Sequence, residues 1–286
     1  MFIGSICAGL VIGVLSGLLG IGGGTVMVPL FRLAYGFNAI AATATSLFTI
    51  IPTSISGVVS HLRNKTCIPK LGLALGIGGA IASPFGVWLA RISPDWLIMV
   101  AAAVVIVYSA YNMLRKALAM KSARVAAGTA GAAGASAGSA AGATVPKAAK
   151  APEALPAAPA LSLKQYAQGA LIGLVAGVLS GYVGVGGGFI MVPLMLAVLN
   201  IPMKLASGTS LIAIFILAIP GTIEQGLAGN IDYLTGIAIA IGSIPGAFIG
   251  AKLIRYVPER TLRFVFAAFL AVAGILLIVK EAGLLG

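Results

Sequence analysis

One block of sequence occurs twice in this chain. Residues 13–30 read GVLSGLLGIGGGTVMVPL and residues 177–194 read GVLSGYVGVGGGFIMVPL, so 13 of the 18 positions are identical. The same offset of 164 residues relates later identities, such as Gly86 with Gly250. Both copies contain a glycine-rich break inside apolar sequence, and a bilayer admits a broken helix only where protein buries it or where it lines a cavity. Two matched breaks are typical of the binding site of a transporter.

The composition places these breaks in a membrane protein. Hydrophobic residues make up 60% of the chain and charged residues 8%, with a mean hydropathy of +1.11, which excludes an ordinary soluble domain. A spanning helix needs about 20 apolar residues. Apolar stretches of suitable length predict membrane helices at 2–19, 39–60, 71–90 and 96–114, and at 168–183, 203–223, 233–253 and 260–279. A shorter apolar piece follows each break, at 25–35 and at 189–199.

This pattern predicts an all-α integral membrane protein with two homologous halves, a first transmembrane repeat at 1–116 and a second at 164–286. Each half is expected to hold three full transmembrane helices and one helical hairpin that is broken at its glycines. Segment 117–163 is rich in Ala, Gly, Ser and Pro and has no periodic apolar face. Such a segment buries too little apolar surface to offset its ordering entropy, so we expect a flexible linker between the halves.

The distribution of basic residues predicts that the second half is inverted relative to the first. Loop 62–70 carries three basic residues and the linker is basic, whereas the matching loop 226–232 has none. In the second half the basic residues gather instead at 252–263. Cytoplasmic loops carry the excess of Lys and Arg, and inverted repeats put more of this charge inside than parallel repeats do. We therefore expect a cytoplasmic linker and both termini on the periplasmic or extracellular side.

The glycine breaks carry chemistry of their own. Glycine permits positive φ and a sharp turn, and Pro29 and Pro193 follow early in the next segment, where a missing N–H costs little. Each break therefore ends in a helix N-terminus, whose free N–H groups and dipole attract anions. We predict that substrate oxygens bind the backbone at Gly22, Gly23, Gly24, Thr25, Gly186, Gly187, Gly188 and Phe189. For the outer glycines the GxxxG spacing favours close helix packing instead, at positions 13, 17, 173, 177 and 181.

A Thr-Ser pair occupies the same place in each half, as Thr45-Ser46 and Thr209-Ser210. Hydroxyls within apolar helices either coordinate an oxyanion or bond back to the carbonyl four residues earlier. The sequence leaves both alternatives open for these four residues, which we include among the candidate substrate-binding groups. Ser16 and Ser180, one turn before the breaks, are further candidates.

Titratable groups are scarce inside the predicted helices. No Asp, Glu or His lies in the middle of one, so the sequence contains no proton relay of the usual intramembrane kind. It also contains no cluster of metal ligands, no haem motif and no Ser/His/Asp set, and we expect neither an enzyme nor a bound metal or cofactor. His61, the one histidine, is expected in an interfacial loop. The net charge of +12 lacks the clustered basic face with aromatic residues of a nucleic-acid binder.

The two GxGGGxxxVPL blocks and the two TSL triplets resemble the sulfite exporter TauE/SafE family of permeases. The resemblance covers about 2–118 and 163–286 and excludes the linker, whose length and composition depart from the family pattern. It implies a bacterial-type inner-membrane permease for small sulfur oxyanions, organosulfur anions or related carboxylates. The positions that match the family motifs are Gly22–Gly24 with Pro29, Thr45-Ser46, Gly186–Gly188 with Pro193, and Thr209-Ser210.

Together these features predict a secondary transporter of small anions that works by alternating access, with sulfite and other sulfur oxyanions or organosulfur anions as expected substrates. Two alternatives remain: an anion channel on the same scaffold, and a membrane scaffold or assembly protein without transport. The sequence leaves open the coupling ion, H⁺ or Na⁺, the direction of transport and the oligomeric state.

Overall fold

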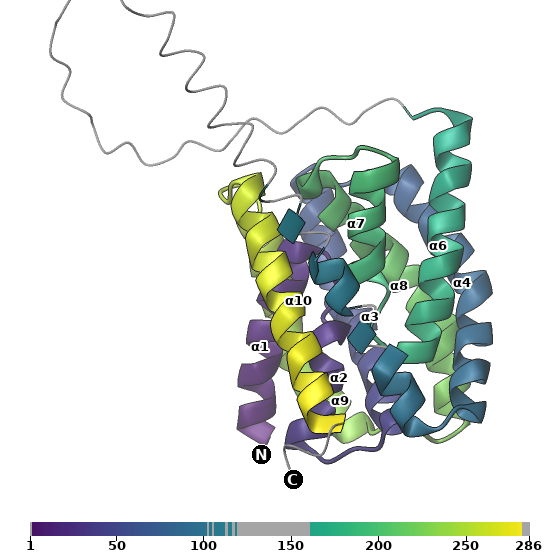
Figure 1. The fold of residues 1–286 in the computed structure, drawn as a ribbon. Coiled ribbons are helices and arrows are strands. Elements are labelled where there is room, and N and C mark those ends of the chain that lie inside the picture. The colour runs from purple at the N-terminus through teal and green to yellow at the C-terminus, as the bar shows by residue number, and fades with distance from the viewer. Residues whose placement is uncertain are drawn as a thin grey trace, which may run out of the picture.

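The computed structural model describes residues 2–101, 103–104, 106–111, 114–115, 118 and 161–281. The predicted linker lies almost wholly outside these residues. All secondary structure in the described residues is helical (Figure 1), which confirms the all-α class. The first half contains α1 (Phe2–Leu19), α2 (Gly24–Ala34), α3 (Ala39–Arg63) and α4 (Pro69–Ile92), followed by the helical segment Asp95–Tyr111. The second half contains α6 (Leu163–Val183), α7 (Gly188–Val198), α8 (Met203–Leu227), α9 (Tyr233–Leu253) and α10 (Glu259–Glu281).

Five of these helices, α3, α4, α6, α8 and α9, are long and apolar enough to cross a membrane. Four shorter apolar helices accompany them: Ile3–Leu19 of α1, α2, α7 and the segment Asp95–Tyr111. The chain is therefore a multi-pass membrane protein. The helices α2 and α7 have 11 residues each, about 16 Å at 1.5 Å per residue, which is about half of a 30 Å hydrocarbon core.

Local capping explains where the observed helices depart from the predicted bounds. The helix α6 begins at Leu163 rather than at 168, because Ser162 and Gln165 form a capping box at its start. The helix α4 begins at Pro69, a residue suited to the first helical turn. The helix α3 continues three residues beyond the predicted end, to Arg63.

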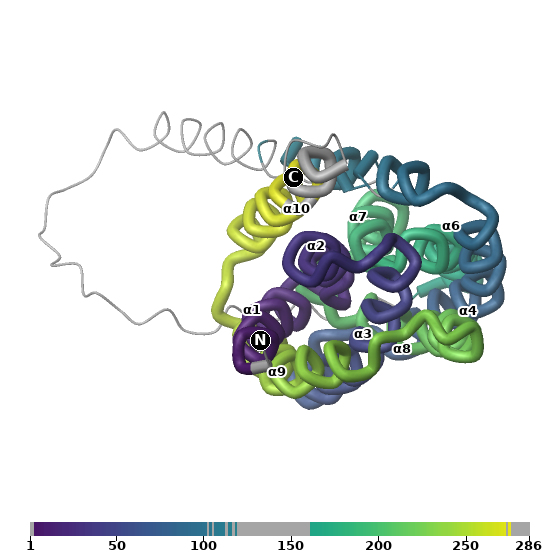
Figure 2. Tube along the Cα trace, turned by 90° about the horizontal axis from the view of Figure 1, so that it is seen from below, coloured from purple at the N-terminus to yellow at the C-terminus, as the bar shows by residue number. Residues whose placement is uncertain are grey.

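Helices of one half pack against helices of the other. Figures 1 and 2 show α1 lying along α9 and α6 lying along α4. A Cβ added to Gly13 would lie 2.3 Å from the carbonyl oxygen of Ser243, and one added to Gly177 would lie 2.3 Å from that of Gly79. Backbones approach this closely only where side chains are absent. The packing alternative for the outer glycines is thus confirmed.

Positions 164 residues apart make matching hydrogen bonds at helix starts. The carboxylate of Asp95 accepts from the N–H of Ala39 at the start of α3, at 3.1 Å. In the second half the carboxylate of Glu259 accepts from the N–H of Met203 at the start of α8, at 3.3 Å. In each half the first acidic residue of the last helix therefore fixes the start of the long central helix.

The described ends of the chain lie at one end of the helical bundle. Figure 1 shows that α1 begins, and α10 ends, at the end opposite to the one where α6 begins. Consequently α1 and α6, which occupy matching places in the two halves, run in opposite directions. We call the end at which α6 begins the linker end.

Candidate functional site

The two glycine breaks lie against each other in the middle of the protein. We define the first break as residues 20–23, the second break as residues 184–187, and their contact as the junction. A Cβ added to Gly24 would lie 2.5 Å from both the carbonyl carbon and the oxygen of Val185. A Cβ added to Gly188 would lie 2.5 Å from the carbonyl oxygen of Gly20. The breaks therefore touch backbone to backbone, and a methyl group at either position would not fit.

Both breaks depend on backbone conformations that glycine adopts readily. The φ angles are +72°, +73° and +83° at Gly20, Gly22 and Gly23, and +72°, +82° and +68° at Gly184, Gly186 and Gly187. Residues other than glycine rarely adopt a positive φ angle. The two breaks thus repeat one backbone path, which ends α1 and α6 and starts α2 and α7.

Two helix N-termini begin at the junction. The carbonyl of Gly23 accepts from the N–H groups of Val26 and Met27, and that of Gly187 accepts from those of Ile190 and Met191. The N–H groups of Gly24, Thr25 and Phe189 donate to no acceptor within the described part of the chain. These residues are buried, and the positive ends of both helix dipoles lie here. The junction is consequently electropositive without a charged side chain.

Four buried hydroxyl groups among the candidate residues have no hydrogen-bond partner in the described part of the chain. They are the side chains of Thr25 and Ser46, and the matched pair Ser16 and Ser180. The Cβ of Ser180 lies 3.5 Å from the place of a Cβ on Gly187, so Ser180 lines the second break. An unpaired buried hydroxyl costs about 1–3 kcal/mol, and such a group is satisfied when a ligand oxygen reaches it.

Ser210 is used differently from Ser46, its match in the first half. The hydroxyl of Ser210 lies 2.6 Å from the carbonyl oxygen of Gly20 and 2.8 Å from that of Ser207. It therefore binds the first break to α8. Ser210 positions the break, whereas the Ser46 hydroxyl stays available.

The hydroxyls of Thr45 and Thr209 each form a hydrogen bond with the backbone just before a helix of the opposite half. The Thr45 hydroxyl accepts from the N–H of Asp232 before α9, at 3.0 Å. The Thr209 hydroxyl accepts from the N–H of Ile68 before α4, at 2.9 Å, and donates to the carbonyl of Leu205 four residues earlier, at 2.7 Å. The bond back to the helix, one of the two alternatives, is thus present at Thr209. Both hydroxyls already have protein partners.

Replacing Thr209 with valine is expected to destabilise the protein by about 1–3 kcal/mol, because the buried N–H of Ile68 loses its acceptor. Thermal unfolding of the purified protein in detergent measures the loss. Thr222→Val is the matched control in the same helix, since the Thr222 hydroxyl has no partner in the described residues. Equal melting temperatures for the two variants would contradict the fastening role of Thr209.

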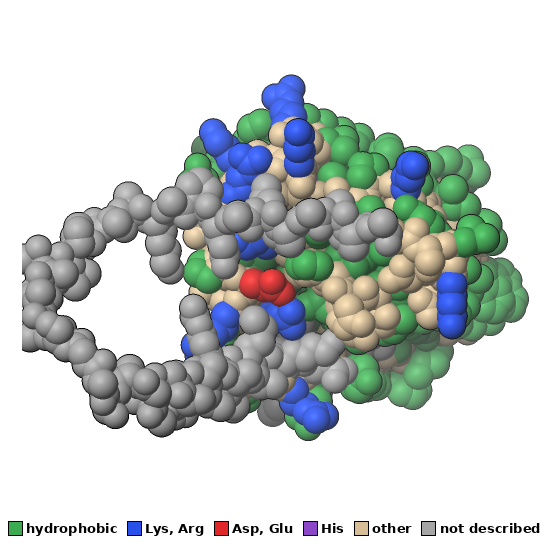
Figure 3. Space-filling view, turned by 90° about the horizontal axis from the view of Figure 1, so that it is seen from above, with side chains coloured by type: hydrophobic (Ala, Val, Ile, Leu, Met, Phe, Trp, Pro, Cys, Tyr) green, Lys and Arg blue, Asp and Glu red, His purple; other side chains and the backbone are tan. Residues whose placement is uncertain are grey.

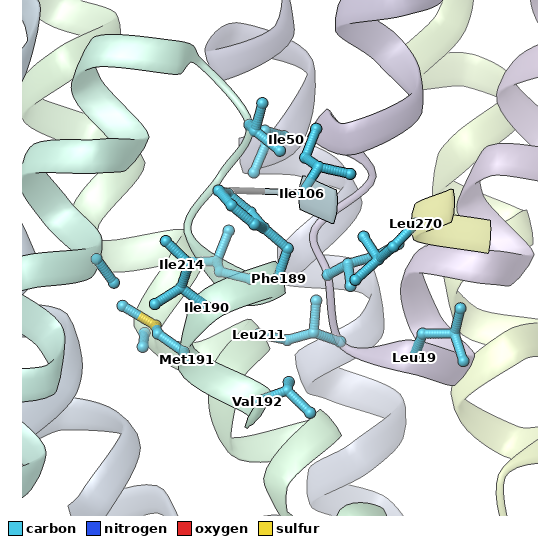
Figure 4. Close-up of a cluster of buried hydrophobic side chains, with 14 of the residues drawn as sticks. Leu19, Ile50, Ile106, Phe189, Ile190, Met191, Val192, Leu211, Ile214 and Leu270 are labelled. Carbon is cyan, nitrogen blue, oxygen red and sulfur yellow. The ribbon is translucent and has the colours of Figure 1, made fainter. Parts of the chain in front are cut away.

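Two isoleucines fill the space beside the junction. Ile50 of α3 and Ile214 of α8 are both fully buried and lie at matching positions of the two halves. A Cβ added to Gly24 would lie 2.8 Å from Cδ1 of Ile50, and one added to Gly188 would lie 2.6 Å from Cδ1 of Ile214. Figure 4 shows both side chains beside the crossing loops, within the central apolar cluster. The junction is therefore closed by apolar side chains in this structure.

Sequence reasoning did not select Ile50 and Ile214. Both follow a TSL triplet by three residues, so their identity across the repeat was visible in the sequence.

The matched positions Thr25 and Phe189 differ in kind, because the first break presents a hydroxyl where the second presents a buried ring. The junction is thus symmetric in its backbone and asymmetric in its side chains.

The expectation that His61 lies in an interfacial loop is wrong. His61 lies in the last turn of α3 and is fully buried. Its Nε2 donates to the carbonyl of Gly17 at 2.9 Å, which leaves Nδ1 to accept from the hydroxyl of Thr66 at 2.7 Å. The matching residue, Gln225, is also buried and accepts from Asn230, the match of Thr66. Both residues therefore tie the end of a central helix to the turn that follows.

Discontinuous helices whose broken ends meet inside a helical membrane protein are typical of membrane transporters. Within that class, the chain belongs to the sulfite exporter TauE/SafE family, which matches residues 5–277.

Three relatives align over nearly their whole length. The chain is 28% identical to the "Probable membrane transporter protein YdhB" of Bacillus subtilis (strain 168), over 93% of this chain and 96% of that protein. It is 26% identical to YunE, of the same description and organism, over 97% of each. It is 24% identical to MJ0441 of Methanocaldococcus jannaschii, likewise described as a probable membrane transporter, over 96% of this chain and 94% of that protein. No solved structure matches the chain significantly.

Proposed function

We propose that this protein is a secondary transporter of small anions, with sulfite and other sulfur oxyanions or organosulfur anions as its substrates. The observation that carries the proposal is the junction, where two buried helix N-termini meet beside hydroxyls without partners. Helix N-termini bind oxyanions through backbone N–H groups and the helix dipole. Substrate oxygens would bind the backbone of residues 22–25 and 186–189 through the free N–H groups there, with the hydroxyls of Thr25 and Ser46. The N–H of Gly188 is not among these donors, because it already donates to the carbonyl of Gly186 at 2.8 Å.

The charge distribution supports a cytoplasmic linker end. Lys and Arg gather around this face in Figure 3. The described basic residues of the loops and helix ends there, which outnumber the one described acidic residue Glu259, are Arg63, Lys65, Lys70, Arg115, Lys164, Lys204, Lys252, Arg255, Arg260 and Arg263. The opposite end carries Asp95, Glu224 and Asp232, and its basic residues include Arg32 and Arg91, of which Arg91 is bonded to Glu224. By the positive-inside rule, the linker faces the cytoplasm, and α1 begins on the other side of the inner membrane.

The relation between the halves supports a mechanism of alternating access. The helices α1 and α6 run in opposite directions, and matched residues make matched contacts across the junction. A two-fold relation of this kind lets one half open to each side of the membrane in turn around a fixed site. With Ile50 and Ile214 in place, the junction corresponds to a state closed to both sides.

Flux in liposomes tests the proposal. The purified full chain is reconstituted, and uptake of sulfite, sulfate, thiosulfate and sulfoacetate is measured with and without H⁺ or Na⁺ gradients. A carrier gives saturable flux that a gradient drives uphill, and the effective gradient identifies the coupling ion. Flux that runs only down the gradient of the anion and does not saturate would favour a channel. If folded protein gives no flux of any of these anions, a scaffold role would be favoured.

Thr25→Val is expected to lower the transport rate by about 10-fold to 100-fold without loss of thermal stability. A hydrogen bond to a charged group contributes about 1.5–3 kcal/mol, and the Thr25 hydroxyl has no described protein partner to lose. Thr222→Val again serves as the control, because its hydroxyl is also unpartnered but lies near the far end of α8. Equal rates in both variants would exclude the Thr25 hydroxyl from the binding site.

A further inference from the structure

An apolar groove of about 320 Å³ runs between the segment Asp95–Tyr111 and α10, and includes Leu114 beyond that segment. The middle of its wall consists of small and aliphatic side chains, including Val107 and Ala110 on one side and Ala267 and Ala271 on the other. None of the residues that line the groove belongs to the junction.

The depth of the groove equals about one leaflet of a bilayer. Along α10 the lining residues run from Phe264 to Ile275, a rise of about 16 Å, against a hydrocarbon core of about 30 Å. Since α10 begins at the linker end (Figure 1), the groove extends from that surface toward the middle of the membrane.

Two arginines flank the mouth of the groove. The guanidinium carbon of Arg115 lies 5.8 Å from the ring centroid of Tyr111, and that of Arg260 lies 5.5 Å from the ring centroid of Phe264. Both rings line the groove. A guanidinium that stacks on a ring uses its face, so the N–H groups in its plane stay free for phosphate oxygens.

The acidic residue nearest in sequence to Arg260 is already engaged. The Glu259 carboxylate is 2.6 Å from the guanidinium of Arg263 and accepts from the N–H of Met203. Arg263 is therefore the partner of Glu259, while Arg115 and Arg260 lie over aromatic rings that line the groove. An apolar groove with two arginines at its opening is complementary to an amphiphile that has an acyl chain and an anionic head group.

We propose that this groove binds one anionic phospholipid of the linker-side leaflet. An acyl chain lies between the segment Asp95–Tyr111 and α10, and the phosphate binds Arg115 and Arg260. Basic pockets between transmembrane helices recognise anionic head groups in this way.

Native mass spectrometry of the full chain in detergent tests this site, using phosphatidylglycerol and phosphatidylcholine with identical acyl chains. Wild type is expected to retain phosphatidylglycerol preferentially. The double variant Arg115→Gln with Arg260→Gln is expected to lose about 30-fold in phosphatidylglycerol affinity and to bind phosphatidylcholine as before. An unchanged preference in this variant would overturn the proposal.

Two further variants separate the groove from general surface charge. Lys70→Gln with Lys252→Gln removes two charges at the same end of the protein from residues that do not line the groove, and is expected to leave the preference intact. An equal loss here would mean diffuse attraction and would overturn the proposal. Ala268→Trp fills the groove and is expected to weaken both lipids. Unchanged lipid binding by this variant would overturn the proposal. So would a wild-type dimer that dissociates in this variant while lipid binding persists, because the groove would then bind a second copy of the chain.

Discussion

Replacing Gly24 with alanine is expected to abolish transport and to destabilise the protein by about 3 kcal/mol, the upper part of the usual range for overpacking. The new Cβ would lie 2.5 Å from the backbone of Val185, and backbone cannot move aside as a side-chain tip can. The breaks would have to separate by about 1 Å to restore an ordinary carbon contact. Displacements of that size cost about 100-fold in enzyme sites. Proteoliposome flux and thermal unfolding measure the two effects.

The control for this prediction is Gly4→Ala, the same substitution in α1. A Cβ on Gly4 meets nothing within 4 Å. Gly4 lies in the first turn of α1, where alanine is at least as favourable for the helix as glycine. This variant is expected to melt at or above the wild-type temperature and to transport normally. Gly188→Ala, the match of Gly24 in the second half, is expected to behave like Gly24→Ala. Normal transport by both junction variants would show that the breaks need not touch.

The helices and both breaks could be predicted from the sequence because their signals are local. Apolar length determines where a chain can span a bilayer, and three adjacent glycines destabilise a helix wherever they occur. Most predicted helices accordingly begin and end within a few residues of the observed bounds. The start of α6 was missed because the capping box that sets it joins Ser162, which was assigned to the linker, to Gln165, which precedes the apolar stretch that begins at 168.

The candidate site was harder to predict, because its chemistry depends on contacts between the halves. The Thr45 and Thr209 hydroxyls fit either substrate or backbone, and only the bonds to Asp232 and Ile68 identify their partners. His61 is near a helix end in the sequence, yet contacts with Gly17 and Thr66 bury it.

Ile50 and Ile214 were invisible for another reason, since isoleucine in an apolar helix carries no chemical signal. Their importance comes from position alone, beside four glycines that have no side chains to fill the space. A Cβ on Gly22 would lie 2.9 Å from Cγ2 of Ile214, and one on Gly186 would lie 2.9 Å from Cδ1 of Ile50. Both isoleucines therefore touch both breaks, and a path through the junction must displace them.

The double variant Ile50→Ala with Ile214→Ala is expected to convert saturable transport into an anion leak. Each truncation removes side-chain atoms that close the junction, while the helix N-termini that attract anions remain. Flux through the variant should exceed the wild-type passive flux, fail to saturate and no longer be driven uphill by an ion gradient. The stability loss is expected to be about 2–5 kcal/mol per site, so unfolding is measured alongside flux.

A third buried isoleucine separates gating from simple loss of packing. Ile98, in the segment Asp95–Tyr111, is fully buried like Ile50 and Ile214, so Ile98→Ala removes the same atoms from a different part of the core. It is expected to lower stability by a similar amount and to keep saturable, gradient-driven transport. A leak in Ile98→Ala, or normal coupled transport in the double variant, would contradict the gate. If the leak arises only at the junction, the two breaks are the path of the anion, because apolar side chains beside them are then what prevents its free passage.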